Sequence, residues 1–297
     1  MKIYIPVVIM LVISCLLFST SCKKRKLNRQ TTTAEDNALA EDLFDDVLKN
    51  INEVAEEENL DGTGKMGNID YTFSSSCATI TLDPPAWDTN GVWNTTFPKT
   101  LTIDFGSVNC TGNDGKKRRG KIISVFTGKY NVTGTIITTT LQDYHIDDYS
   151  VEGTKSVTNT GSNSFSIVVD GLVASPDGSQ EVTWSSTRTR TWIEGQNTGF
   201  WTPNPDNSCC MFFNGILDDV YSISGTAEGI NREGRSFTVN ITTPLRVEFC
   251  GWIPEITEGV LEIQPKDLKK RTVDFGDKSC DRQYMVIIKN KTYTRSF

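Results

Sequence analysis

The sequence has very little histidine and none of the short motifs that mark common enzyme classes. His145 is the only histidine among 297 residues. This scarcity argues against histidine-rich metal sites and against catalytic triads, although a triad needs only one histidine. No Gly-x-Ser-x-Gly elbow, Walker loop, Cys-x-x-Cys or His-Glu-x-x-His is present. We therefore assign no catalytic residue, no metal ligand and no cofactor from the sequence.

Positive charge and long apolar runs are also scarce. The chain carries 30 Lys and Arg against 37 Asp and Glu, which gives a net charge of -7. A nucleic-acid partner is not expected, because such a partner selects a basic face. The main apolar run spans residues 3–18. It is too short and wrongly flanked for a stable spanning helix.

The surroundings of that apolar run predict a bacterial lipoprotein signal. A positive start at residues 1–2 precedes it, and the small residues 19–21 come directly before Cys22. A peptidase that cleaves before a lipidated cysteine needs small side chains next to the cut. We therefore expect a signal peptide over residues 1–21, a lipid on Cys22 and a polar tether over residues 22–33.

Two other interpretations of the leader stay open. One is an ordinary secretory signal with an incidental cysteine. The other is lipidation at Cys15, where residues 12–15 fit a strict lipobox better but the apolar residues 16–18 would stay on the mature protein. Cysteine parity favours Cys22, because losing Cys15 with the signal and lipidating Cys22 leaves six of the eight cysteines, an even number.

Residues 34–60 are predicted to form one amphipathic helix. Apolar residues recur there at spacings of three and four, and Thr32 and Glu35 have the spacing of a capping box. The other face is acidic, with Glu35, Asp36, Glu41, Asp42, Asp45, Asp46, Glu53, Glu56, Glu57 and Glu58. We expect a solvated acidic face over an apolar stripe that packs on the remaining domain. The alternative is a helix that docks a partner.

The pattern changes to period two over residues 66–297, which predicts an antiparallel β domain. In one example, Leu101, Ile103 and Phe105 alternate with polar residues. One buried face and one wet face are typical of antiparallel sheets. Short connections favour hairpins and meanders, because parallel pairs need long crossovers. The expected fold is all-β, with about a dozen strands and one N-terminal helix.

A loose repeat, Tyr-x-Val/Ile-x-Gly-Thr, occurs at residues 130–135, 149–154 and 221–226. Glycine inside a strand permits a sharp bend, and an aromatic side chain can cover the gap that it leaves. We therefore expect a strongly curved meander, similar to a sandwich or a half-barrel.

A longer repeat appears in residues 77–110 and 250–280. Each block begins and ends with cysteine and contains Thr-x-Asp-Phe-Gly. If each block is a hairpin, its register brings the two ends close together. An exported location permits disulfides. The expected bonds are Cys77–Cys110 and Cys250–Cys280.

Three further features carry weaker functional signals. Asp104 and Asp274 occupy matching positions of the longer repeat, so they are either an acid and base pair of a glycosidase or partners of the adjoining turn or a cross-strand cation. The adjacent Cys209 and Cys210 form either a strained, reducible disulfide or a structural staple or buried thiols. His145 lies near a predicted turn, where a hydrogen-bonded or exposed histidine is expected rather than a ligand.

The best candidate for a binding face is formed by Trp184, Arg188, Arg190 and Trp192. Strand alternation puts these four side chains on one face. Tryptophans beside arginines can stack on a sugar or hold an anionic group. The alternative is a ladder that pairs with acidic residues of a neighbouring strand.

Several segments resemble uncharacterised lipoproteins of Bacteroidota. They are residues 102–106 with Cys110, 119–123, 149–155 and 187–192. The resemblance covers most of residues 68–297 and implies a lipidated all-β protein, but the family supplies no known activity. In that group, acidic residues after the lipidated cysteine are associated with surface export. Here residues 23–26 are basic, which favours a periplasm-facing leaflet of the outer membrane.

These observations favour a lipid-anchored protein of the cell envelope with a structural or ligand-binding role. Its expected partners are the membrane, through the covalent lipid, and a glycan or an envelope protein. One alternative is a periplasmic carrier of lipids or lipoproteins, with a curved sheet and a helix that enclose an apolar cavity. A further alternative is a secreted glycan hydrolase.

Overall fold

The computed structural model describes residues 27, 30–57, 60, 77–87, 90, 92, 94–196, 201–203, 211–213, 217–251 and 253–296. Its one long helix is α2 (Thr32–Glu57). The strands are β1 (Thr79–Asp83), β2 (Lys99–Asp104), β3 (Cys110–Thr111), β4 (Lys117–Phe126), β5 (Ile136–Ile146), β6 (Tyr149–Gly161), β7 (Ser164–Ala174), β8 (Glu181–Glu194), β9 (Trp201–Pro203), β10 (Met211–Phe213), β11 (Val220–Ile230), β12 (Ser236–Cys250), β13 (Ile253–Pro265), β14 (Arg271–Asp277), β15 (Gln283–Ile288) and β16 (Lys291–Ser296).

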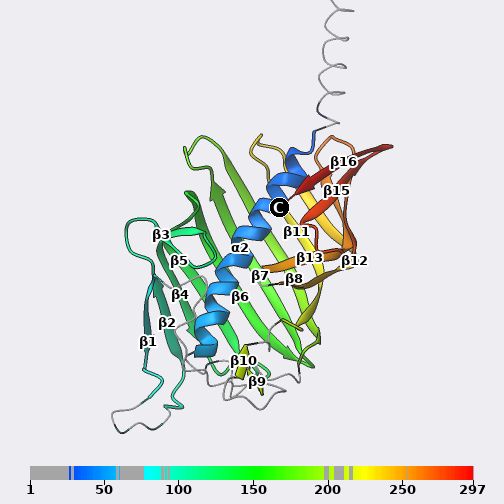
Figure 1. Cartoon of the computed structure of the whole chain (residues 1–297). Helices are drawn as coiled ribbons and strands as arrows, with labels where there is room; N and C mark the ends of the chain where they lie inside the picture. The colour runs from blue at the N-terminus through cyan, green and yellow to red at the C-terminus, as the bar shows by residue number, and fades with distance from the viewer. Residues whose placement is uncertain are drawn as a thin grey trace, which may run out of the picture.

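Fourteen strands form one sheet, in the order β1-β2-β4-β5-β6-β7-β8-β11-β12-β13-β14-β15-β16, with β3 paired to β4. Almost every strand pairs with its neighbour along the chain and every pair is antiparallel, as short connections require. The hairpin β9–β10 is inserted between β8 and β11. The sheet curves around α2, and β1 and β16 form its two edges (Figure 1). The predicted curved all-β meander with one helix is confirmed, and it resembles a half-barrel more than a sandwich.

Helix α2 lies across the concave face of the sheet (Figure 1). The predicted helix is confirmed, and it begins at Thr32, two residues before the predicted start. The cap is Thr31 rather than Thr32, because the Thr31 hydroxyl donates to Glu35 Oε1 at 2.6 Å and the Ala34 amide donates to the Thr31 carbonyl at 2.7 Å. The helix thus starts where its first amides find an acceptor.

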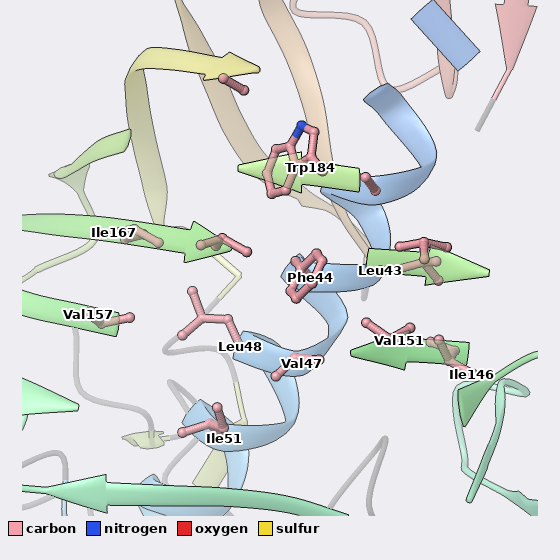
Figure 2. Close-up of a cluster of buried hydrophobic side chains, with 14 of the residues drawn as sticks. Leu43, Phe44, Val47, Leu48, Ile51, Ile146, Val151, Val157, Ile167 and Trp184 are labelled. Atoms are coloured by element: carbon pink, nitrogen blue, oxygen red, sulfur yellow. The ribbon is translucent and has the colours of Figure 1, made fainter. Parts of the chain in front are cut away.

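The core lies between α2 and the sheet. Figure 2 shows Phe44, Leu48 and Ile51 of α2 among apolar side chains of the strands, such as Val157 and Trp184. All five are buried. Complete burial of one such side chain stabilises the fold by about 1.5–3 kcal/mol, so the helix is held mainly by this apolar stripe.

Two paired glycines, on β6 and β7, lie in the part of the sheet that packs beneath the helix. Gly153, in one copy of the short repeat, has a φ of 128°, and it pairs with Gly171 on β7. A Cβ at Gly171 would lie 2.1 Å from Phe44 Cζ. The phenyl ring therefore packs directly on the backbone of β7. This aromatic cover lies over Gly171, which is outside the short repeat; the atoms nearest to a Cβ at the repeat glycines Gly153 and Gly225 belong to the backbone of the neighbouring strand.

The two long repeats form matching corners. Cys77 is bonded to Cys110 and Cys250 to Cys280, with Cα–Cα distances of 6.0 Å and 5.5 Å, so both predicted disulfides are present. In each Thr-x-Asp-Phe-Gly segment the aspartate accepts a hydrogen bond from the glycine amide, at 2.9 Å in the first and 3.0 Å in the second. The phenylalanine of each segment packs on a tyrosine, with ring centroids 6.0 Å and 5.9 Å apart.

Candidate functional site

The acidic face of α2 is solvated only in part: Asp42 and Asp45 are exposed as expected, but other acidic residues of the helix are turned toward the sheet. Asp36 and Asp46 are buried, and several other acidic residues of the helix pair with cations on the strands and turns. The ion pairs are Glu35–Arg295, Asp36–Arg232, Glu41–Arg188, Asp42–Lys116, Asp45–Lys155, Asp46–Lys116 and Asp46–Arg118. The physical reason is complementarity: the concave face carries buried cations, and a buried cation needs a charged partner.

Arg118, on β4, is at the centre of this network. Its side chain is fully buried and its Nη2 lies 2.5 Å from Asp46 Oδ1 and 2.7 Å from Asp114 Oδ2. Its Nε donates to Asp46 Oδ2 at 3.0 Å, and the Tyr144 hydroxyl donates to the same oxygen at 3.3 Å. Hydrogen bonds of this kind with a charged group are stronger than those between neutral groups. The cluster fastens α2 to β4 and β5.

Protonation of the network follows from burial and pairing. Burial acts to raise the pKa of Asp114, but the hydrogen bonds and the charge of Arg118 outweigh it and lower that pKa to about 2. For Asp36, burial dominates and raises the pKa in spite of Arg232. Lys155 is enclosed between β6 and the helix, and burial lowers its pKa. It donates to the Phe44 carbonyl at 2.8 Å.

Trp184 and Arg188 of the predicted binding face lie under the helix. The Trp184 indole nitrogen donates to Asn37 Oδ1 at 3.0 Å, and the indole ring stacks on Phe44 with centroids 5.9 Å apart. Arg188 Nη2 donates to Glu41 Oε1 at 3.1 Å. Both side chains are buried. They are occupied by α2 and form no exposed platform.

Arg190 and Trp192 continue the same face beyond the helix contacts. The Arg190 guanidinium donates to the Tyr130 hydroxyl and lies over the rings of Phe165 and Tyr221, at 5.2 Å and 4.8 Å from their centroids. Trp192 stacks on Tyr221 at 5.8 Å. The alternation that we inferred for these residues is correct, but the face points inward. The prediction of a surface for sugar stacking is therefore corrected to an internal face.

The outer face of the sheet carries a shallow groove across β8, β11, β12 and β13. Two adjoining depressions of about 610 Å³ and about 540 Å³ form it, and they share Ser185, Glu228, Thr238 and Gln264. Most of the outward side chains that line the groove are hydroxyl, amide, carboxylate or ammonium groups. They include Thr183, Thr187, Thr226, Asn240, Glu262 and Lys270. Such a lining offers both donors and acceptors to a hydrophilic ligand.

The remaining candidate residues are dispersed. Asp104 and Asp274 lie on β2 and β14, which eight strands of the sheet separate, so they do not converge on one site. His145 Nδ1 lies 2.9 Å from the Asp143 carbonyl, a local contact. Cys22, Cys209 and Cys210 lie outside the described residues.

One group of metal-type ligand atoms occurs among the described residues. Oxygen or sulfur atoms of Cys250, Glu255 and Cys280 lie within 4.8 Å of one another. The two sulfurs are bonded to each other, and Glu255 Oε1 accepts from the Arg282 amide, so this group serves the corner. Within the described part of the chain, no helix has the length and apolar character that crossing a bilayer requires.

The sequence reasoning missed the network around Arg118. A signal for it exists: cations occur at inward positions of strands, as Lys155 does between the buried Val151 and Val157. A charge at an inward position requires a partner from another element. The acidic helix supplies several such partners, among them Glu41, Asp45 and Asp46.

Comparison with known proteins adds no relative, because no family model, no curated protein and no solved structure matches this chain.

Proposed function

We propose that this chain is a lipid-anchored protein of the cell envelope, attached through Cys22 to the periplasm-facing leaflet of the outer membrane. The leader and the small residues before Cys22 support this proposal. The two disulfides add support, because such bonds persist in oxidising compartments outside the cytosol. The role that we propose is binding rather than catalysis.

The outer groove is the surface that we propose for the ligand. The observation that supports this proposal is the lining of the groove, where hydroxyl, amide and carboxylate groups follow one another across four neighbouring strands. An extended hydrophilic polymer such as a glycan can exchange its hydrogen bonds with water for bonds to these groups. The concave face offers no comparable surface, because α2 covers it in the described residues.

The two alternatives receive less support. A carrier of lipids requires an open concave face, and the apolar stripe of α2 occupies that face. A glycan hydrolase requires two carboxyl groups about 5–9.5 Å apart across the scissile bond. Asp104 and Asp274 instead each bind the glycine of their own corner.

The anchor is tested by mass analysis of the mature protein. We expect wild type to begin at Cys22 and to carry acyl mass on that residue. Cys22→Ser should abolish acylation, whereas Cys15→Ser should leave it unchanged, since Cys15 is removed with the signal. Acylation that survives Cys22→Ser and is lost with Cys15→Ser would contradict the assignment of the lipidated residue.

The ligand surface is tested with a panel of envelope glycans. Thr238 lines both depressions, so Thr238→Trp should fill the groove and reduce binding at least about tenfold, as loss of a few hydrogen bonds predicts. The matched control is Thr138→Trp on the exposed side of β5, outside the groove. Equal binding by both variants, or no glycan bound by wild type, would remove the groove proposal.

A further inference from the structure

One end of the molecule carries a cluster of basic turns. The turn at residues 231–235 joins β11 to β12, that at residues 266–270 joins β13 to β14, and residues 289–291 lead from β15 into β16. Together these turns contain seven Lys or Arg and two Asp or Glu, a local charge of +5, in a chain whose net charge is -7. We call the following exposed or half-buried residues the basic turn surface: Arg235, Lys266, Lys269, Lys270, Lys289 and Lys291.

The three turns are neighbours in space. The Lys266 amide donates to the Ser236 carbonyl at 2.9 Å, and Arg235 Nη1 donates to the Lys266 carbonyl at 3.2 Å. The pairing of Thr272 with Ile287 brings the β13–β14 turn beside the β15–β16 turn. The cations therefore form one continuous surface at this end of the sheet.

The residues that precede α2 leave the fold at the same place. Arg271, the first residue of β14, donates from Nη2 to the carbonyls of Leu27 and Gln30, at 3.1 Å and 3.2 Å. Four residues lie between Cys22 and Leu27, which makes five steps along the chain, and an extended chain spans at most about 3.6 Å per step. A lipid on Cys22 would thus hold this end of the sheet within about 18 Å of the bilayer surface.

We propose that the basic turn surface contacts anionic phospholipid head groups of the leaflet that holds the anchor. Cations near an anionic leaflet are attracted to it within about one Debye length, roughly 8–10 Å, which the tether permits. The same end is acidic over β5–β8, where the turns carry Asp147, Asp148 and Asp177. The molecule therefore tilts so that β11–β16 lie nearer to the membrane than β5–β8. This inference rests on the proposed anchor but concerns orientation and not the groove.

The test compares hydrogen exchange of the acylated protein on two kinds of vesicle. One contains phosphatidylglycerol and phosphatidylcholine in equal amounts, and the other contains phosphatidylcholine alone. We expect amides of residues 266–270 and 289–291 to exchange about fivefold more slowly on the anionic vesicles. The difference should vanish at about 1 M salt, where the Debye length falls to about 3 Å.

Charge reversals supply the matched pair of variants. Lys269→Glu with Lys291→Glu, neither of which lines the groove, should abolish the slowing. The control, Lys129→Glu with Lys278→Glu, changes the charge equally at positions outside the basic turn surface and should retain it. Equal exchange on both vesicles, in a protein with confirmed acyl mass, would overturn this inference and leave the anchor intact. If the acyl mass is missing, the proposed lipid on Cys22 is contradicted. The purified chain is then mixed with the same two kinds of vesicle, and slower exchange on the anionic vesicles still tests whether the basic turn surface contacts anionic head groups.

Discussion

Strand β8 presents two faces of opposite character. Toward the helix it carries Trp184, Arg188 and Arg190, all buried, and outward it carries uncharged hydroxyl residues such as Thr187. The charged side chains are thus inside and the neutral polar ones outside, the reverse of the usual distribution. The inner face tolerates this because α2 supplies the Glu41 carboxylate to Arg188, and strands β7 and β11 supply aromatic rings to Arg190. Charge in a strand therefore does not by itself indicate exposure; what matters is whether another element carries the opposite charge.

The largest loss of stability is expected from a substitution at the centre of the inner face. Asp46→Ala removes one of the two carboxylates on the buried Arg118 guanidinium and should lower the free energy of unfolding by about 3–5 kcal/mol. The measurement is equilibrium denaturation. Asp46→Ala combined with Arg118→Leu should recover part of the loss, because no charge is then left unpaired. A loss below about 1 kcal/mol for Asp46→Ala would show that the pair is not needed.

A smaller effect is expected on how the unfolding free energy depends on pH. The pKa of Asp114 is about 2 in the folded protein, below its ordinary value near 3.9, so its contribution is complete above that ordinary value and is lost as pH falls toward 2. The contribution is roughly 2 kcal/mol. Asp114→Asn should flatten the decline of the unfolding free energy between about pH 5 and 2.

The contrast for this prediction is Asp177 in the exposed β7–β8 turn. Its pKa is also about 2, lowered by hydrogen bonds from Ser175 and Ser179. Because solvent screens that site, Asp177→Asn should change the pH profile less than Asp114→Asn does. The reverse order would show that the buried network is not the main acid-sensitive element.

The smallest effect is expected on the outer face. Thr187→Val keeps the shape and β propensity of an exposed side chain on β8, so the unfolding free energy should stay within about 0.5 kcal/mol of wild type. The same denaturation assay provides the measurement. A large loss would mean that the outer hydroxyl rows are structural, which would weaken the comparison between the two faces.

Local pattern was sufficient for much of the fold. The three and four spacing located α2, the period-two stretches predicted the meander, and hairpin register paired Cys77 with Cys110. Alternation also grouped the residues of the β8 face correctly. Periodicity separates two faces, however, without saying which one another element covers.

The candidate site escaped the sequence for that reason. The contact between Asp46 and Arg118 joins positions 72 residues apart, and nothing in either local segment specifies it. The groove is likewise assembled from four strands whose outward residues become neighbours only when the strands pair. The cap at Thr31 was misplaced by one residue, because residues 31–33 are three consecutive threonines.

The positions of the two crosslinks imply an order of opening. Cys77 ties the first edge strand to the β3–β4 hairpin, and Cys250 ties the end of β12 to the segment before β15. The two bonds therefore crosslink segments toward the two margins of the sheet. The middle strands β5–β8 are held by backbone pairing and by their contacts with the helix. Reduction of both bonds would therefore loosen the margins of the sheet before its middle strands, and a loosened edge strand exposes unpaired backbone groups to other chains.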